Sequence, residues 1–202
     1  GFSVYSPPRF GQVWAEDCIK FTQEVFQKIT ETPSIEIVVL ASGADYFLKG
    51  RALVNEGNSS VEKEVSISLA AEHMRATIRA LHRAGKRVVL VEPPPYGGFD
   101  IGRCIERSNT EKYLFGADKD CRIPLVTYKE RSKDSMAFLN KVINGGLVNV
   151  FSVRDAICGE SHCDTMLGNV IIYRDAGHLS YEGSLALAEM VNLSAKLFDL
   201  AK

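Results

Sequence analysis

Three short apolar segments constrain the fold of this chain more than any other feature. They are residues 35–41, 87–91 and 148–151. Nearly continuous apolar runs of this length, bounded by turn-forming residues, are typical of strands that are buried on both faces. Segments with the apolar spacing of amphipathic helices separate them, at about 16–30, 67–81 and 126–143. Strands that alternate with helices predict an α/β domain with a central parallel sheet.

Weaker signals fill the remaining chain. Residues 1–5 alternate as a strand does, and 46–61 is polar enough to indicate a loop with a short turn of helix. Residues 96–124 show no sustained period, which predicts an irregular insertion. Gly168-Asn169 separates two short apolar segments and is typical of a tight hairpin turn. The last helix is predicted to begin at Ser180 as N-cap, with an inward face that continues to Phe198.

The composition is that of one ordinary globular domain. The 202 residues are enough to bury a substantial core, and we expect a single domain over 1–202. The net charge of -1 argues against nucleic acid as a partner. No apolar run approaches the length of a membrane span. The chain opens directly on a strand-like segment without a signal peptide, so we expect it to be a fragment of a longer protein.

The five cysteines indicate an oxidising compartment. Cys18 shares a helical apolar stripe with residues 14, 21, 25 and 29 and is expected to be a buried free thiol. The other four lie in segments rich in turn formers. We expect a short loop closed by Cys158–Cys163 and a longer insertion closed by Cys104–Cys121. A zinc site is the weaker interpretation, because Cys158, His162 and Cys163 lack a second ligand pair at suitable spacing.

Asp175 and His178 form the candidate catalytic pair. They lie three residues apart in a short loop, after an apolar strand-like segment and before an amphipathic helix. A carboxylate that holds one nitrogen of an imidazole leaves the other free to act as a general base. The alternative is that Asp175 caps the turn and His178 is an ordinary loop histidine. Because sites in parallel sheets lie at the carboxyl ends of strands, the loops 42–46, 93–96 and 175–178 are expected to gather there.

The block Asp175-Ala-Gly-His178-Leu-Ser-Tyr-Glu-Gly183 resembles the last conserved block of SGNH (GDSL-like) hydrolases. It is most similar to the extracytoplasmic SGNH domain fused behind the membrane part of acyltransferase family 3 proteins, which O-acetylate lipopolysaccharide O-antigen and other surface glycans. The resemblance extends upstream to residues 35–41, to residues 87–95 and to Cys158…Cys163, and so covers most of the chain. The resemblance implies a three-layer, flavodoxin-like fold, with helices on both faces of the parallel sheet.

The resemblance also implies a mechanism that this chain carries only in part. His178 would take a proton from a serine in a G-D-S block while Asp175 orients the ring, but no G-D-S occurs in the sequence. We expect the nucleophile upstream of residue 1, together with the family's first strand and first helix. Ser3 or Ser6 as nucleophile and a degenerate, non-catalytic domain are the alternatives. The amide of Gly43 is the oxyanion candidate, although a plain turn is an equal alternative there because the family's asparagine is absent.

The expected function is therefore that of an extracytoplasmic SGNH domain in a membrane-bound O-acyltransferase. It would transfer acetyl groups to hydroxyls of a cell-surface polysaccharide without metal or cofactor. The expected partners are the glycan acceptor and the membrane acyltransferase region of the same polypeptide. The domain would lie on the periplasmic or extracellular face, tethered to the inner membrane. A secreted carbohydrate esterase and a non-catalytic glycan-binding domain are the alternatives.

Overall fold

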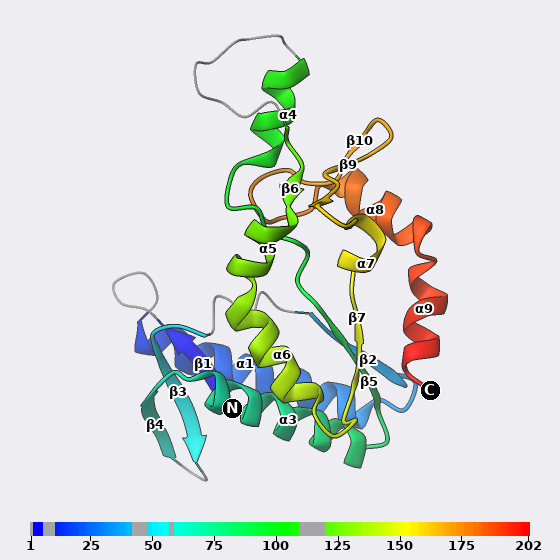
Figure 1. Cartoon of the computed structure of the whole chain (residues 1–202). Helices are drawn as coiled ribbons and strands as arrows, with labels where there is room; N and C mark the ends of the chain where they lie inside the picture. The colour runs from blue at the N-terminus through cyan, green and yellow to red at the C-terminus, as the bar shows by residue number, and fades with distance from the viewer. Residues whose placement is uncertain (1, 6–10, 42–47, 57–58, 110–119) are drawn as a thin grey trace. The chain divides into compact units, whose positions relative to one another are not determined.

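The computed structural model describes residues 2–5, 11–41, 48–56, 59–109 and 120–202 (Figure 1). The chain divides into two compact units. Unit 1 comprises residues 1–91, 134–150 and 200–202, and unit 2 comprises residues 92–133 and 151–199. In the described part of the chain the fold is mixed α/β, with a small parallel three-stranded sheet and eight helices. None of these helices is long and apolar enough to cross a membrane.

The parallel sheet contains the three predicted apolar segments. Its strands are β2 (Ile37–Ala41), β5 (Arg87–Val91) and β7 (Asn149–Phe151), in the order β2-β5-β7. Strands β2 and β5 are parallel and in register from Ile37 opposite Arg87 to Ala41 opposite Val91. The prediction of parallel strands is thus confirmed, with boundaries shifted by at most two residues. Burial on both faces holds for β5 but not for β2, whose Val39 is 42% exposed.

Three long helices of unit 1 form a common core with this sheet. They are α1 (Gln12–Glu31), α3 (Ile67–Arg83) and α6 (Lys133–Ile143). The core contains Val88 and Leu90 of the sheet, Ile78 of α3 and Phe138 of α6. Arg75 of α3 donates to backbone oxygens at the end of α6, at 2.7 Å for both Val142 and Asn144. Apolar packing and these bonds together join α3 to α6.

A second sheet corrects the prediction of a loop at 46–61. Strands β1 (Phe2–Tyr5), β3 (Arg51–Glu56) and β4 (Ser59–Glu64) are antiparallel, in the order β1-β3-β4. The predicted strand at 1–5 is confirmed as β1. Ala52, Leu53 and Val54 are buried, and β3 pairs on both sides. The loop prediction was wrong because three apolar residues among polar ones give no clear period, whereas two neighbouring strands make such a segment a central strand.

Helix α1 faces the core differently from the prediction. Ala15 and Ile19 are its buried residues, and they pack with Leu53 of β3. The predicted stripe is largely outside, with Phe21 67% exposed. Cys18 is a free thiol as expected, but it is half-buried rather than buried. Of the larger apolar residues of α1, Phe26 and Ile29 pack against the main core of unit 1, while Phe21 and Val25 are exposed.

Unit 2 is built from shorter elements. Its helices are α4 (Ile101–Asn109), α5 (Leu125–Arg131), α7 (Arg154–Ile157), α8 (Tyr181–Met190) and α9 (Leu193–Leu200), whose last residue lies in unit 1. Its strands are β6 (Ile123–Pro124), β8 (His162–Cys163), β9 (Met166–Leu167) and β10 (Val170–Ile171). Strand β6 pairs with β8, and β9 pairs with β10 across the predicted hairpin turn.

Three predictions about helices in this region are corrected. The insertion at 96–124 is not wholly irregular, because it contains α4. The helix predicted at 126–143 is two helices, α5 and α6, which separate at Ser132. The Ser132 hydroxyl donates to the carbonyl of Tyr128 at 2.7 Å, a local bond that competes with helix continuation. The final helix breaks at Asn192, whose φ of 47° is left-handed. The buried residues of α8 are Gly183 and Leu187, while Phe198 of α9 is exposed.

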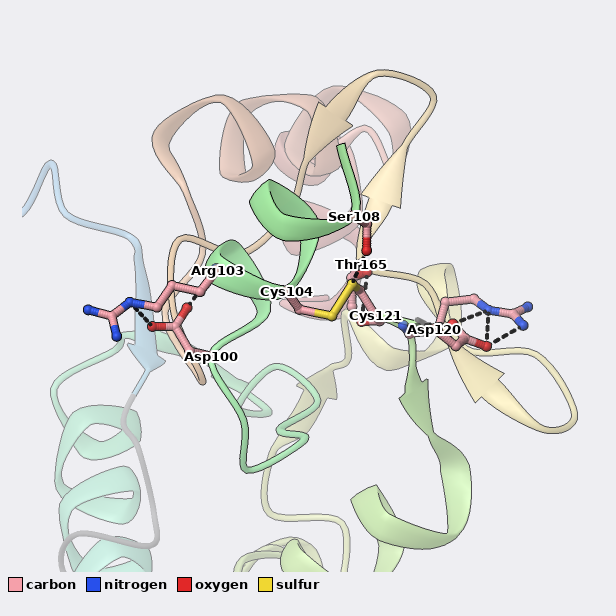
Figure 2. Close-up of a disulfide and its surroundings, with 8 residues drawn as sticks. Asp100, Arg103, Cys104, Ser108, Asp120, Cys121 and Thr165 are labelled. Atoms are coloured by element: carbon pink, nitrogen blue, oxygen red, sulfur yellow. Dashed lines mark hydrogen bonds and ion pairs between the residues drawn. A yellow bond between two sulfur atoms is a disulfide. The ribbon is translucent and has the colours of Figure 1, made fainter. Parts of the chain in front are cut away.

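Both predicted disulfides are present. Cys104 of α4 is bonded to Cys121, which lies just before β6 (Figure 2). Cys158 is bonded to Cys163, and the two residues are also backbone partners in an antiparallel bridge. The buried hydroxyl of Thr165 donates to the carbonyl of Cys121 at 3.1 Å (Figure 2). The disulfides therefore fasten α4 to the segment before β6 and the end of α7 to β8.

Candidate active site

The Asp175–His178 pair lies in a short loop that is closed at its base. Tyr173 and Leu179 are partners in an antiparallel bridge. The amide of Arg174 donates to the carbonyl of His178 at 3.0 Å. Tyr173 is completely buried, as is Ile172 before it, so the strand-like segment that leads into the loop is anchored in the core of unit 2. The pair is thus carried by a loop with two fixed ends.

Helix α8 fixes the far end of the loop. Ser180 is its N-cap, as predicted, and its hydroxyl accepts from the amide of Gly183 at 2.8 Å. The amide of Ser180 donates to the carbonyl of Ile172 at 2.8 Å. A Cβ on Gly183 would lie 2.5 Å from the Cα and the carbonyl oxygen of Ile172. Only glycine fits there, and this close approach joins the first turn of α8 to the segment before the loop.

Asp175 makes the hydrogen bonds expected of a turn cap and also those expected of a partner for the His178 ring. Its Oδ1 accepts from the amides of Gly177 at 3.0 Å and His178 at 2.9 Å. The His178 Nδ1 lies 3.0 Å from Oδ1 and 2.9 Å from Oδ2 of the same carboxylate. Asp175 therefore both caps the turn and holds the imidazole ring of His178 in place. The two interpretations of the sequence do not exclude each other.

These bonds define the protonation of the pair. The amides of Gly177 and His178, and then the His178 ring, hold the pKa of Asp175 well below its ordinary value of 3.8. An ionised carboxylate can only accept, so the Nδ1 of His178 carries the hydrogen. The Nε2 of the neutral ring then has a free lone pair. Because the His178 side chain is 61% exposed, this nitrogen is accessible as a general base.

The start of α4 lies against the loop. A Cβ on Gly102 would overlap the carbonyl oxygen of Arg174, so the helix backbone approaches the loop closely at this glycine. The Asp100 Oδ1 accepts from the amide of Arg103 at 2.9 Å, which starts the helix (Figure 2). One turn further on, Cys104 forms its disulfide (Figure 2). The Cys104–Cys121 bond therefore helps to hold the helix that supports the Asp175–His178 loop.

Tyr96 is a second neighbour of the loop. A Cβ on Gly177, between the two residues of the pair, would lie 3.2 Å from the Cδ2 of Tyr96. The predicted meeting of the segments 93–96 and 175–178 is therefore observed. The third predicted segment, 42–46, lies outside the described residues, and so does the oxyanion candidate Gly43.

Sequence reasoning missed a buried polar group in unit 2. The Tyr128 hydroxyl donates to the Oε1 of buried Glu92 at 2.7 Å, and the Nη1 of Arg154 lies 3.6 Å from the same oxygen. Burial, and then the Glu92 carboxylate, raises the pKa of Tyr128. Glu92 directly follows a buried strand, and that position was the signal available in the sequence.

The other predicted site residues are placed as follows. Ser3 lies in β1, where its backbone pairs with Leu53, and Ser6 lies outside the described residues. Cys158 and Cys163, considered above as zinc ligands, form a disulfide instead. Among the described residues, no group of three or more His, Cys, Asp or Glu side chains could hold a metal ion.

The parallel sheet and the loop just before α8 that carries Asp175 and His178 define an α/β protein of the SGNH class. A family model described as "SGNH domain (fused to AT3 domains)" matches residues 3–192. The chain therefore belongs to the family of SGNH domains that are fused to AT3 domains. This match confirms the resemblance stated above.

One solved structure supports the fold. It is the structure of the Salmonella ser. Paratyphi A lipopolysaccharide acetyltransferase periplasmic domain, with a TM-score of 0.61 and 22% sequence identity. The alignment covers 88% of this chain and 63% of that chain, so this chain spans less than two thirds of that protein domain. A search of curated proteins finds no match.

Proposed function

We propose that this chain is the extracytoplasmic SGNH domain of a membrane-bound O-acyltransferase. It transfers acetyl groups to hydroxyls of a cell-surface polysaccharide such as lipopolysaccharide O-antigen. The geometry of Asp175 and His178 is the observation that carries the proposal, because it leaves the Nε2 of His178 free and accessible. Membership of a family fused to AT3 domains supports the proposal, as does the similarity to a lipopolysaccharide acetyltransferase domain.

The reaction proceeds in two acyl transfers. The Nε2 of His178 takes the hydroxyl proton of a serine as its oxygen attacks the acyl carbonyl of the donor. The protonated ring gives this proton to the leaving group, and an acyl-serine results. His178 then takes a proton from a sugar hydroxyl, which attacks the acyl-serine, and returns it to the serine oxygen. Asp175 stabilises the ring cation in both steps, and the amide of Gly43 helps to bind the oxyanion.

The serine is placed upstream of residue 1, on a first strand and helix that complete the domain. Two features of unit 1 support this placement. Among the described strands, β2 has a neighbour on one side only, and its Val39 is 42% exposed. Helix α1 also presents the apolar side chains of Phe21 and Val25 to solvent. A further strand and helix of the same polypeptide would cover apolar surface of this kind.

The complete domain is a single three-layer, flavodoxin-like domain. The family match spans both compact units, which favours one domain over two. Val88 and Leu90 of β5 belong to the core that contains α3 and α6. Val89 points to the opposite face of the sheet, because side chains alternate along a strand, and it is also completely buried. Both faces of β5 are therefore covered, as a three-layer fold requires.

The protein acts on the periplasmic or extracellular side of the inner membrane. A membrane acyltransferase region of the same polypeptide supplies the acetyl group and tethers the domain, and the glycan is the acceptor. The two disulfides support this location, because such bonds persist in oxidising compartments. No cofactor enters the reaction.

The test is acetyl transfer to surface polysaccharide by the full-length protein. His178→Ala should lower the rate by about 10³-fold or more, because the general base is lost. Asp175→Asn should have an effect of similar order, while His162→Ala, a matched histidine elsewhere in unit 2, should leave the rate unchanged. A His178→Ala protein that retains more than a tenth of the activity would contradict the proposal.

Two other results would select the alternatives. Acetate release to water at a rate that does not depend on the glycan would identify an esterase. Glycan binding that survives His178→Ala, together with no turnover in the wild type, would identify a non-catalytic binding domain.

A further inference from the structure

Arg131 at the end of α5 has an exposed side chain that is nevertheless held in place. Its Cζ lies over the ring of Tyr96, 5.6 Å from the ring centroid. The guanidinium also fills the space beside Gly98, where a Cβ on that residue would overlap it. Gly98 also has a left-handed φ of 79°, which favours glycine. An aromatic ring and a glycine turn therefore position this guanidinium.

Tyr96 connects this arginine to the candidate active site. The ring edge packs on Gly177, the residue whose amide donates to Asp175. Tyr96 remains 37% exposed, so part of the ring is open to solvent beside the Asp175–His178 loop. All of these residues belong to unit 2. The stacked arginine and the catalytic pair therefore lie on neighbouring segments of one compact unit.

Arg131 is not neutralised, unlike comparable arginines of the same unit. Three of those pair with an aspartate one to three residues away, namely Arg103–Asp100, Arg122–Asp120 and Arg174–Asp175. Within the part of the chain that the structure describes, Arg131 forms no ion pair with an acid. A guanidinium that is already ordered, but whose charge is unpaired, loses little freedom when it binds an anion.

We propose that Arg131 binds an oxyanion group of the acceptor glycan, a carboxylate or a phosphate, next to the Asp175–His178 pair. The guanidinium matches such groups because its planar donors can form two parallel bonds to them. The exposed part of the Tyr96 ring offers an apolar surface to the face of a sugar ring. The identification of the ligand as a glycan rests on the proposed function. The inference adds that this glycan is acidic.

The test is a binding titration of the full-length protein by isothermal titration calorimetry. The probes are trigalacturonate, its neutral counterpart galactotriose, and galactose 6-phosphate, which separates phosphate from carboxylate recognition. Arg131→Gln should weaken the binding of an acidic probe about tenfold and leave galactotriose unaffected, since hydrogen bonds from the charged guanidinium to the oxyanion are lost. Arg131→Lys should recover part of the affinity, because it keeps the charge but loses the planar donors.

Lys129→Gln is the matched control, because it removes one positive charge from an exposed position on the same helix. The inference is overturned if this control weakens binding as much as Arg131→Gln. It is also overturned if the wild type binds galactotriose as tightly as the acidic probes, or binds none of them.

Acetyl-transfer assays separate this inference from the proposed function. Full transferase activity on an acidic acceptor in the Arg131→Gln protein would overturn the inference alone. Arg131-dependent binding of an acidic probe in a protein without transferase activity would support the inference and contradict the proposed function.

Discussion

Unit 1 and unit 2 reach a folded structure by different means. Unit 1 contains long helices and a parallel sheet (Figure 1). Its main core, between these elements, is apolar. Unit 2 carries the candidate site on a framework whose strands are each two residues long. Strands this short give little stability of their own. Unit 2 has an apolar core of its own around Ile172 and Tyr173. Two disulfides, close glycine contacts and a buried Glu92–Tyr128 bond add to this core.

Stability and the candidate site depend on different kinds of contact in this chain. Apolar packing in unit 1 depends on total volume and on periodic sequence, and it tolerates many combinations of residues. The loop with Asp175 and His178 depends on individual atoms, such as the amide of Gly177. We therefore expect substitutions in unit 1 to act mainly on stability. Substitutions in unit 2 should change the geometry of the site at a smaller cost in stability.

The largest effect is expected in the core of unit 1. Phe138→Ala removes a buried ring from α6 and should lower the free energy of unfolding by about 3–5 kcal/mol. Denaturation followed by the fluorescence of Trp14, the only tryptophan, measures this loss within unit 1. Val13→Ala, at a 72% exposed position of α1, is the control and should change it by less than about 0.5 kcal/mol. Equal effects of the two variants would mean that this core does not dominate the stability.

The second-largest loss of stability is expected when the disulfide that closes the longer loop of unit 2 is removed. Its cysteines are 17 residues apart, so the Cys104→Ala/Cys121→Ala variant should lose about 3 kcal/mol of stability. The matched variant Cys158→Ala/Cys163→Ala opens a loop of only 5 residues and should lose about 2 kcal/mol. Chemical denaturation measures both, and NMR signals of the His178 ring report on unit 2. The comparison of units fails if neither variant changes the His178 signals.

A smaller effect is expected where α4 meets the loop with Asp175 and His178. Gly102→Ala places a methyl group against the carbonyl of Arg174, and backbone cannot move aside cheaply. We expect a loss of about 1–3 kcal/mol, even though alanine is the better helix former. Acetyl transfer should fall as well, because the loop is displaced. Gly159→Ala is the control, since its Cβ would have no neighbour closer than 3.9 Å. A stable, fully active Gly102→Ala protein would show that this contact is not needed.

The smallest effect is the pH dependence due to Asp175. Its pKa is lowered in the folded state, so its contribution to stability is complete above its ordinary value of 3.8. As the pH falls below that value the unfolded chain takes up the proton first, and the contribution is lost. Because the side chain is exposed by more than a third, we expect less than about 1 kcal/mol. Melting temperatures of the wild type and Asp175→Asn should therefore converge between about pH 5 and pH 2. A difference that grows on acidification would contradict this sign.

The sequence predicted the elements that local pattern encodes. The three apolar strands, the hairpin at Gly168 and the Ser180 cap were all found. Both disulfides and the pairing of Asp175 with His178 were found as well. Each of these depends on residues that are close in sequence, on composition, or on a motif. Such features need no knowledge of the rest of the fold.

The contacts between segments that are distant in sequence could not be predicted from local pattern. Helix α1 could bury either its predicted apolar stripe or Ala15 and Ile19, and packing on β3 selected Ala15 and Ile19. Nothing local to Tyr96 or Arg131 indicates that they stack beside the Asp175–His178 loop. The physical reason is that periodicity reports only which face of an element is apolar. What that face contacts depends on side-chain volumes and backbone approach across the whole chain.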